Sequence, residues 1–319
     1  MNFSDVLKAL KNQKNKILIG LISSFVFLFI YFPFSDLSTL ITSEVATLTQ
    51  NEIFLQLDEL KLKLFPSPGV DMSKVSVDIG QLPTIKAEEV SVSPSPSVIF
   101  SQTPAGTFSA KGIFKGNMTV QMSSGKKTES GLPRQKIEIK ADKLNLADLK
   151  DFKQIPLLLK GQLSIHGNIL ADLSFSEQPD ADIEIQAEKF EIPSQGFQTA
   201  MGPMNLPDLK LGKIQIKGKL IEGRLNIEEG KIGQEGDDIH GQIKGQIALI
   251  IRNQNGILTE PGAYSFDLDL NIRKETEDKL NTFLGFISQF KTPILDGSRY
   301  RLKLSAQNPY FPPTMGALR

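Results

Sequence analysis

The stretch GKIQIKG, from Gly212 to Gly218, alternates polar and apolar side chains between two glycines. Successive side chains of a β-strand point to opposite faces, so this alternation predicts a strand with one apolar and one polar face. GQLSIHG (residues 161–167) repeats the same order of residue types, and GQIKGQIALII (residues 241–251) is a looser copy. Because the copies recur at irregular intervals, they predict one long twisted sheet built from similar hairpins, and not a solenoid of fixed period.

Alternating patterns of this kind dominate the chain after residue 52. Charged and apolar residues alternate in RQKIEIKAD (134–142), DADIEIQAEKFEI (180–192) and RYRLKLSA (299–306). IFLQLDELKLKLF (53–65) alternates with one slip, and further strands are expected at 75–79, 85–92 and 108–120. A strand with one charged face is typical of an antiparallel sheet that packs on one side and meets water on the other. The predicted fold class is therefore mainly β, a large twisted antiparallel β-sheet domain with a few amphipathic helices.

Three segments have apolar residues at helical spacing instead. Residues 36–50 follow Ser35, which is a suitable N-cap, and residues 144–152 form a shorter candidate. The strongest helix is expected from Thr276 to Phe290, where the apolar stripe consists of Leu280, Phe283, Leu284, Ile287 and Phe290. This helix is predicted to cap an open end or face of the sheet, and the alternative is a helix that contacts a membrane or a partner.

The N-terminus carries the longest apolar segment. Residues 17–32 contain no charged side chain, and the basic residues before them are Lys8, Lys11, Lys14 and Lys16, against a single Asp5. By the positive-inside rule, a membrane helix here keeps the N-terminus in the cytoplasm and exports the rest. A cleaved signal peptide and a buried core segment are the alternatives, although no small-residue cleavage site follows the run directly. We therefore expect a cytoplasmic N-terminus (1–16), a transmembrane anchor (17–35) and an exported β-rich domain (36–319).

Composition argues against several classes of function. The chain has 36 Lys plus Arg and 36 Asp plus Glu, so no net charge favours nucleic acid. It has no Cys, which removes disulfides, thiolate catalysis and thiolate metal sites, and its two His residues are His166 and His240. Nor does the sequence contain a Gly-x-Ser-x-Gly nucleophile motif. We therefore expect no enzyme activity and no cofactor, and we assign no catalytic, cofactor-binding or metal-binding residues.

Three short motifs suggest chemistry, but each has a simpler explanation. GKKTES (125–130) lacks the upstream glycine of a phosphate-binding loop and predicts a polar loop. GQEGDDIHG (233–241) brings together Asp237, Asp238 and His240 without the spacing of a calcium or zinc site, so it predicts a turn. Asn117 begins a glycosylation sequon that lies inside an alternating strand.

The order of strands, glycines and prolines resembles type II secretion system protein N, the GspN family. The resemblance covers nearly the whole chain and rests on the N-terminal segment ending in YFPF, on LQLDELKLKLFPSPGVDMSKVSVDIG (55–80) and on LPDLKLGKIQIKGKLIEGRLNIEEGKIGQEGDDIHGQIKGQIAL (206–249). The last part is also similar to AsmA-like envelope proteins. The resemblance implies a single-pass protein of the bacterial inner membrane with an AsmA-like or sandwich-like periplasmic domain, and it carries no site residues across.

Two functions are therefore expected as alternatives. In the first, the protein is a non-enzymatic accessory component of the type II secretion system. It would contact other secretion subunits through exposed strand edges or the tail QNPYFPPTMG (307–316), unless this tail packs on its own sheet or is disordered. In the second, the apolar face between Ile137 and Ile251 binds or transfers lipid, as in AsmA-like proteins. The expected partners are the membrane and either secretion subunits or lipid, with no nucleic acid. A large uncovered apolar area would favour the second function.

Overall fold

The computed structural model of the chain describes residues 19–20, 23–24, 34–63, 67–80, 82–95, 104–127, 131, 133–150, 157–199, 202–253 and 257–318. Most of the predicted transmembrane anchor (17–35) lies outside the described residues. In the part of the chain that the structure describes, no helix combines the length and hydrophobicity needed to cross a bilayer.

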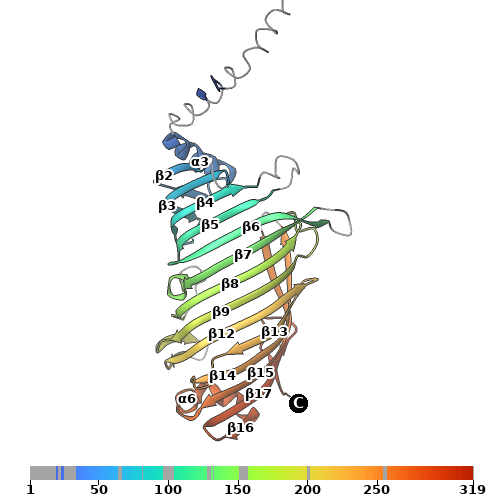
Figure 1. The fold of residues 1–319 in the computed structure, drawn as a ribbon. Helices are drawn as coiled ribbons and strands as arrows, with labels where there is room; N and C mark the ends of the chain where they lie inside the picture. The colour runs from blue at the N-terminus through green and yellow to red at the C-terminus, as the bar shows by residue number, and fades with distance from the viewer. Residues whose placement is uncertain are drawn as a thin grey trace, which may run out of the picture.

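Sixteen strands form one antiparallel sheet, in which β1-β3-β4-β5-β6-β7-β8-β9-β12-β13-β14-β15-β17-β16 are successive neighbours. β2 pairs with β3, β18 pairs with β17, and β10 and β11 form a separate two-stranded ribbon. Figure 1 shows the strands following one another along the molecule, from α3 and β2 at one end to β16 and α6 at the other. The strands are β1 (Ile53–Gln56), β2 (Glu59–Lys63), β3 (Gly69–Ile79), β4 (Ile85–Pro94), β5 (Gly106–Ile113), β6 (Gly116–Lys127), β7 (Pro133–Asn145), β8 (Lys160–Ala171), β9 (Asp180–Ile192), β10 (Gln195–Thr199), β11 (Gly202–Leu206), β12 (Leu209–Ile221), β13 (Arg224–Ile232), β14 (Ile239–Asn253), β15 (Ile257–Arg273), β16 (Lys291–Ile294), β17 (Gly297–Ala306) and β18 (Thr314–Ala317).

This architecture confirms the mainly β fold and the large antiparallel sheet. The described residues form one large sheet, and no second large sheet is stacked on it within those residues. The sandwich-like arrangement is therefore not what this part of the chain adopts.

Two segments that the pattern presented as single strands are each divided. Residues 53–65 contain β1 and β2, which both pair with β3 and are separated by Leu57 and Asp58. Residues 108–120 contain parts of β5 and β6, joined by a turn in which Phe114 and Lys115 have φ angles of 46° and 61°. A tight hairpin turn needs positive φ at both central residues and usually contains Asn or Gly, so this turn has no clear sequence signal. β6 also includes residues 125–127, which were predicted to lie in a loop; residues 128–130 lie outside the described residues.

Helices lie near both ends of the sheet, and one short 3-10 helix contacts β8 in its middle. α3 (Phe34–Leu48) confirms the helix predicted at 36–50 and contacts β1 and β2. Of the helix predicted at 144–152, residues 144–145 belong to β7, Leu146–Leu149 form the 3-10 helix η1 and Lys150 is also helical, while residues 151–152 lie outside the described residues. The helix predicted from Thr276 to Phe290 is wrong as one element, because it consists of α6 (Lys274–Lys279), α7 (Asn281–Leu284) and η2 (Gly285–Phe290). The predicted position of this segment is correct, since α6 and η2 contact the last strands of the sheet.

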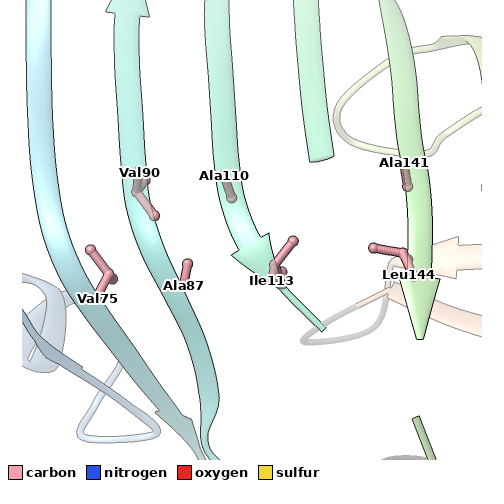
Figure 2. Close-up of a cluster of buried hydrophobic side chains, with 7 residues drawn as sticks. All are labelled: Val75, Ala87, Val90, Ala110, Ile113, Ala141 and Leu144. Atoms are coloured by element: carbon pink, nitrogen blue, oxygen red, sulfur yellow. The ribbon is translucent and has the colours of Figure 1, made fainter. Parts of the chain in front are cut away.

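Two clusters of buried side chains form the core. The N-terminal cluster lies on β3, β4, β5 and β7 and consists of Val75, Ala87, Val90, Ala110, Ile113, Ala141 and Leu144 (Figure 2). We call α6, α7 and η2 together the helical segment. The C-terminal cluster joins strands β12, β15 and β17 to this segment and consists of Leu209, Ile272, Leu280, Leu284, Tyr300 and Leu302. The candidate site crosses the same sheet and includes members of both clusters, among them Ala141 and Leu302.

Candidate functional site

The register of the sheet assigns each side chain to one of two faces, because residues paired across neighbouring strands point to the same side. The row that we call the central row crosses the sheet from β2 to β18 and consists of Leu62, Val70, Val92, Phe108, Val120, Ile139, Gly167, Ile183, Gly218, Ile227, Gly245, Phe266, Leu304 and Met315. Every member of this row is apolar or glycine.

A second row runs beside the central row with the same property. It consists of Leu60, Met72, Val90, Ala110, Met118, Ala141, Ile165, Ile185, Ile216, Gly230, Ile243, Leu268, Leu302 and Ala317. On the other side of the central row, a shorter row includes Ile137, Ile169, Ala181, Leu220, Leu225, Ile247 and Tyr264. We call these three rows together the apolar face.

The second glycine of each repeated stretch (Gly167, Gly218 and Gly245) lies in the central row. Ile183 on β9 is paired with Gly167 on one side and Gly218 on the other, and Ile227 lies between Gly218 and Gly245. Residues with large side chains and glycines thus alternate from strand to strand. This arrangement lets a sheet curve toward this face. The similarity of GQLSIHG and GKIQIKG therefore reflects two strands that flank β9 in the same way.

The opposite face is polar along the same strands. One of its rows consists of Lys61, Asp71, Ser91, Ser109, Thr119, Lys140, His166, Glu184, Lys217 and Glu229. Lys217 Nζ lies 3.6 Å from the Glu184 carboxylate, and His166 Nε2 lies 3.0 Å from Asp142 Oδ1. His166 thus lies on the polar face, where the pattern places it. The sheet separates a wet side from an apolar side over most of its length.

Most apolar side chains in the middle of the apolar face are half-buried, whereas Ala141, Ala181 and Leu220 are buried. The side chains of Ile183, Ile185, Ile216, Ile227 and Ile243 are all half-buried, whereas Tyr300 and Leu302, under the helical segment, are 1% and 2% exposed. Among the described residues, α3 contacts β1 and β2, and α6 and η2 contact β15 and β17. α3, α6 and η2 thus cover the ends of the sheet, and between them, in the described part of the chain, the short helix η1 contacts β8.

Polar contacts hold the helical segment on the C-terminal end. Ser298 Oγ and Tyr300 Oη donate hydrogen bonds to the Glu277 carboxylate at 2.6 and 3.0 Å, and Lys291 forms an ion pair with it. Burial would raise the pKa of Glu277, but hydrogen bonds from Lys291, Ser298 and Tyr300 outweigh it and keep this pKa below its ordinary value. Burial and the nearby Glu277 raise the pKa of Tyr300 to about 12. The protein segment that covers the C-terminal end of the sheet therefore brings polar anchors with it.

The acidic turn at 233–241 has a structural role. Asp237 Oδ2 accepts hydrogen bonds from the N–H groups of Gly212 and Gln234, and Asp238 accepts from the Lys210 N–H and the Thr276 hydroxyl. These bonds tie the β13–β14 turn to β12 and α6. Within the described ranges, no three His, Asp or Glu side chains are grouped as a metal site would require.

His240 borders a polar hollow of about 410 Å³ that includes Asp269, Asn271 and Arg299. Its Nε2 lies 3.2 Å from the Asn271 amide nitrogen. Arg299 donates two hydrogen bonds to the Asp269 carboxylate, at 2.7 and 2.5 Å, and these hold the pKa of Asp269 below its ordinary value. The charges of Asp269 and Arg299 satisfy one another, and we rank this hollow below the apolar face as a candidate site.

The apolar face was predictable only as separate strands. Each alternation in the sequence indicates which residues share a face of one strand, but pairing decides whether those faces form continuous rows. The chain matches no protein family model, no curated protein sequence and no solved structure in the comparisons made with each.

Proposed function

We propose that this protein binds lipid acyl chains on the apolar face of its sheet, and that it holds or transfers lipid in the bacterial envelope. The observation that carries the proposal is the continuity of the central row, which crosses the sheet without one polar side chain while its middle stays partly exposed. A sheet face of this size that no other layer covers is a binding surface for something apolar.

Acyl chains fit this face better than a protein partner does. Protein interfaces are about as polar as ordinary protein surface and contain many hydrogen bonds. The helical segment has such hydrogen bonds, since Glu277 accepts from Ser298 and Tyr300 on β17. The central row offers no side-chain donor or acceptor over roughly 60 Å, taking about 4.8 Å between neighbouring strands. An occupant of the middle of the face therefore gains from being apolar along its whole length.

The location of the protein is part of the same proposal. The charge-free segment at 17–32 would anchor the chain in the inner membrane with the sheet in the periplasm, as the basic residues before it favour. α3 begins at Phe34, so the N-terminal end of the sheet would lie close to the bilayer. Such an arrangement would give lipids a short route from the membrane to the apolar face.

The experiment compares two arginine variants of neighbouring residues on β9. Ile183→Arg places a charge in the central row, whereas Asp182→Arg places the same charge on the polar face. Full-length chains are purified in amphipol, and the phospholipid that copurifies with each is extracted and counted by mass spectrometry. Because lipid around the anchor is common to both variants, we expect a lower lipid-to-protein ratio for Ile183→Arg alone. Equal ratios in folded proteins would contradict lipid binding on this face.

One observation favours the secretion-accessory function as a second candidate. Leu295, Tyr310 and Phe311, which lie near the C-terminal edge of the sheet, are 100%, 81% and 66% exposed. β18, in the same tail as Tyr310 and Phe311, pairs with β17 and leaves these two side chains free to contact a secretion subunit. A photo-crosslinker placed at Tyr310 in cells would test this function: crosslinks to a secretion subunit would support it, and crosslinks to lipid alone would argue against it.

A further inference from the structure

The end of β14 lies beyond the strand that would normally pair with it. Arg224, the first residue of β13, pairs with Ala248, so the residues of β14 after Ala248 have no strand on that side. Two contacts take the place of the missing strand. The Leu249 N–H donates to the Gly223 carbonyl at 2.7 Å, and the next residue facing that side, Ile251, is bound by a side chain from another part of the sheet.

That side chain is Gln178, in the loop between β8 and β9. Its Nε2 donates to the Ile251 carbonyl at 3.0 Å, and its Oε1 accepts from the Ile251 N–H, also at 3.0 Å. One amide group thus makes both hydrogen bonds that a neighbouring strand would make. In Figure 1 the far ends of β14 and β15, in orange, rise behind the ends of the strands that carry this loop.

The loop that carries Gln178 is held in shape on both sides. Asp172, which is 3% exposed, accepts hydrogen bonds from the Ser174 hydroxyl, the Ser176 hydroxyl and N–H, and the Glu177 N–H. Arg134 on β7 donates to the Gln178 carbonyl at 3.1 Å and to Asp180 Oδ2 at 2.7 Å. These contacts hold the loop without any help from β14. They therefore fix the position from which the Gln178 side chain reaches Ile251.

We propose that Gln178 is a positioning residue that fixes the curvature of the sheet, and with it the width of the apolar face. β9, β12, β13 and β14 are successive neighbours, so the Gln178–Ile251 contact joins the first and fourth of these strands across the two between them. A sheet without a second layer can change its twist, and a link between its first and fourth strands restricts that change. Its consequence for lipid rests on the function proposed above, because Ile183 lies on β9, the first linked strand, and Ile227 lies on β13, between the linked strands.

The structural part is tested by spin-label distances in the full-length chain. The sequence has no Cys, so Asp182→Cys on β9 and Thr259→Cys on β15 introduce the only two labels. We expect one narrow distance distribution in the parent chain and a broad or shifted one with Gln178→Ala. Gln178→Glu still accepts from the Ile251 N–H but cannot donate when ionised, so its distance distribution should be intermediate. This variant replaces Gln178→Ala in the test if Gln178→Ala does not fold. Gln186→Ala on β9 is the matched control, because the Gln186 amide donates to Glu188 on its own strand and does not link distant strands. A distribution for Gln178→Ala that equals the control would overturn the inference.

The functional part uses vesicles of phosphatidylethanolamine and phosphatidylglycerol with a trace of pyrene-labelled phospholipid. We expect the labelled lipid to leave the Gln178→Ala protein about tenfold faster than it leaves the Gln186→Ala protein, as the loss of two hydrogen bonds implies. Equal rates together with altered distances would refute control of the lipid site by Gln178. If the parent chain takes up no labelled lipid, the proposed function fails, while the spin-label distances still decide whether Gln178 fixes the curvature.

Discussion

Single glycines determine how closely the strands of the central row approach one another. At Gly245 a Cβ atom would lie 2.2 Å from the Ser265 carbonyl oxygen and 2.8 Å from Phe266 Cα, and the φ angle is +149°. Both the space and the backbone conformation therefore require glycine here. Gly167 differs, since its Cβ would meet nothing closer than 3.9 Å. The glycines that the sequence presents as copies thus have different tolerances.

Replacing Gly245 by alanine is expected to lower the free energy of unfolding by about 3 kcal/mol, because the backbone atoms of β15 would have to move and the φ angle is unfavourable for alanine. Gly285→Ala is the control, since that residue has a φ angle of −52° and nothing lies within 4 Å of its added Cβ. Urea unfolding followed by circular dichroism measures both. A Gly245→Ala protein as stable as Gly285→Ala would contradict the close approach of β14 and β15.

Introducing a carboxylate by mutation is expected to distinguish the uncovered part of the apolar face from the covered part. Leu302→Asp places a carboxylate under the helical segment, where Leu302 is 2% exposed, and is expected to cost at least about 3 kcal/mol. Ile216→Asp lies in the same row of side chains, but Ile216 is half-buried, so its carboxylate keeps water and costs about 1 kcal/mol. Equal losses of unfolding free energy in lipid-stripped protein would show that the middle of the face is as dry as the end.

The loop between β8 and β9 is an element that depends on one carboxylate. Burial would raise the pKa of Asp172, but hydrogen bonds from Ser174, Ser176 and Glu177 outweigh it and lower this pKa from 3.8 to about 2. Because the pKa of Asp172 is lower in the folded protein than in the unfolded chain, ionised Asp172 stabilises the fold at pH values above the unfolded-state pKa. This stabilisation is lost as the pH falls toward the folded-state pKa. The contribution is about 2 kcal/mol, lost between roughly pH 4 and pH 2.

Asp172→Asn is therefore expected to destabilise the protein by about 2 kcal/mol at pH 7 and by much less near pH 2, because the neutral amide cannot accept all four hydrogen bonds. Chemical unfolding at a series of pH values measures this difference. Asp182→Asn removes an exposed carboxylate from β9 and should leave the free energy of unfolding unchanged at pH 7. If Asp172→Asn were destabilised equally at both pH values, the carboxylate charge would not be what holds the loop.

Features that depend on local sequence, such as single strands, were predictable. Features that depend on contacts between distant residues were not. The alternation in DADIEIQAEKFEI predicts β9 well, since both the apolar and the charged side of that strand are determined by local sequence. The division of the helix at 276–290 depends on distant contacts. Leu280 leaves the helical conformation, with φ of −94° and ψ of 6°, where Leu280 and Leu284 both reach buried positions against β12, β15 and β17. The Gln178–Ile251 contact joins residues 73 positions apart and has no pattern in the sequence.

Both ends of the sheet finish in pairs of short strands. β1 and β2 lie end to end on β3, and β16 and β18 lie end to end on β17. Lys61 and Lys63 lie in β2, and β16 contains Lys291 and Pro293. Short edge strands that carry lysine or proline disfavour the addition of a further strand. The molecule is thus built to limit pairing at its ends while it leaves the face between them open.

The uneven covering of the sheet predicts uneven stability across the whole molecule. Strands such as β3 and β17, whose side chains form the two buried clusters, should open less often than the middle parts of β9, β12 and β13, where half-buried Ile183, Ile216 and Ile227 belong to neither cluster. In lipid-stripped full-length protein, we expect backbone amides of the middle strands to exchange with deuterium roughly tenfold faster than those of β3 and β17. Loading with phospholipid should slow exchange in the middle strands and leave the ends unchanged, because acyl chains would replace the missing layer there. Mass spectrometry of peptides from each strand measures both rates. Equal protection along the stripped sheet, or slowing confined to the ends, would contradict an open face in the middle.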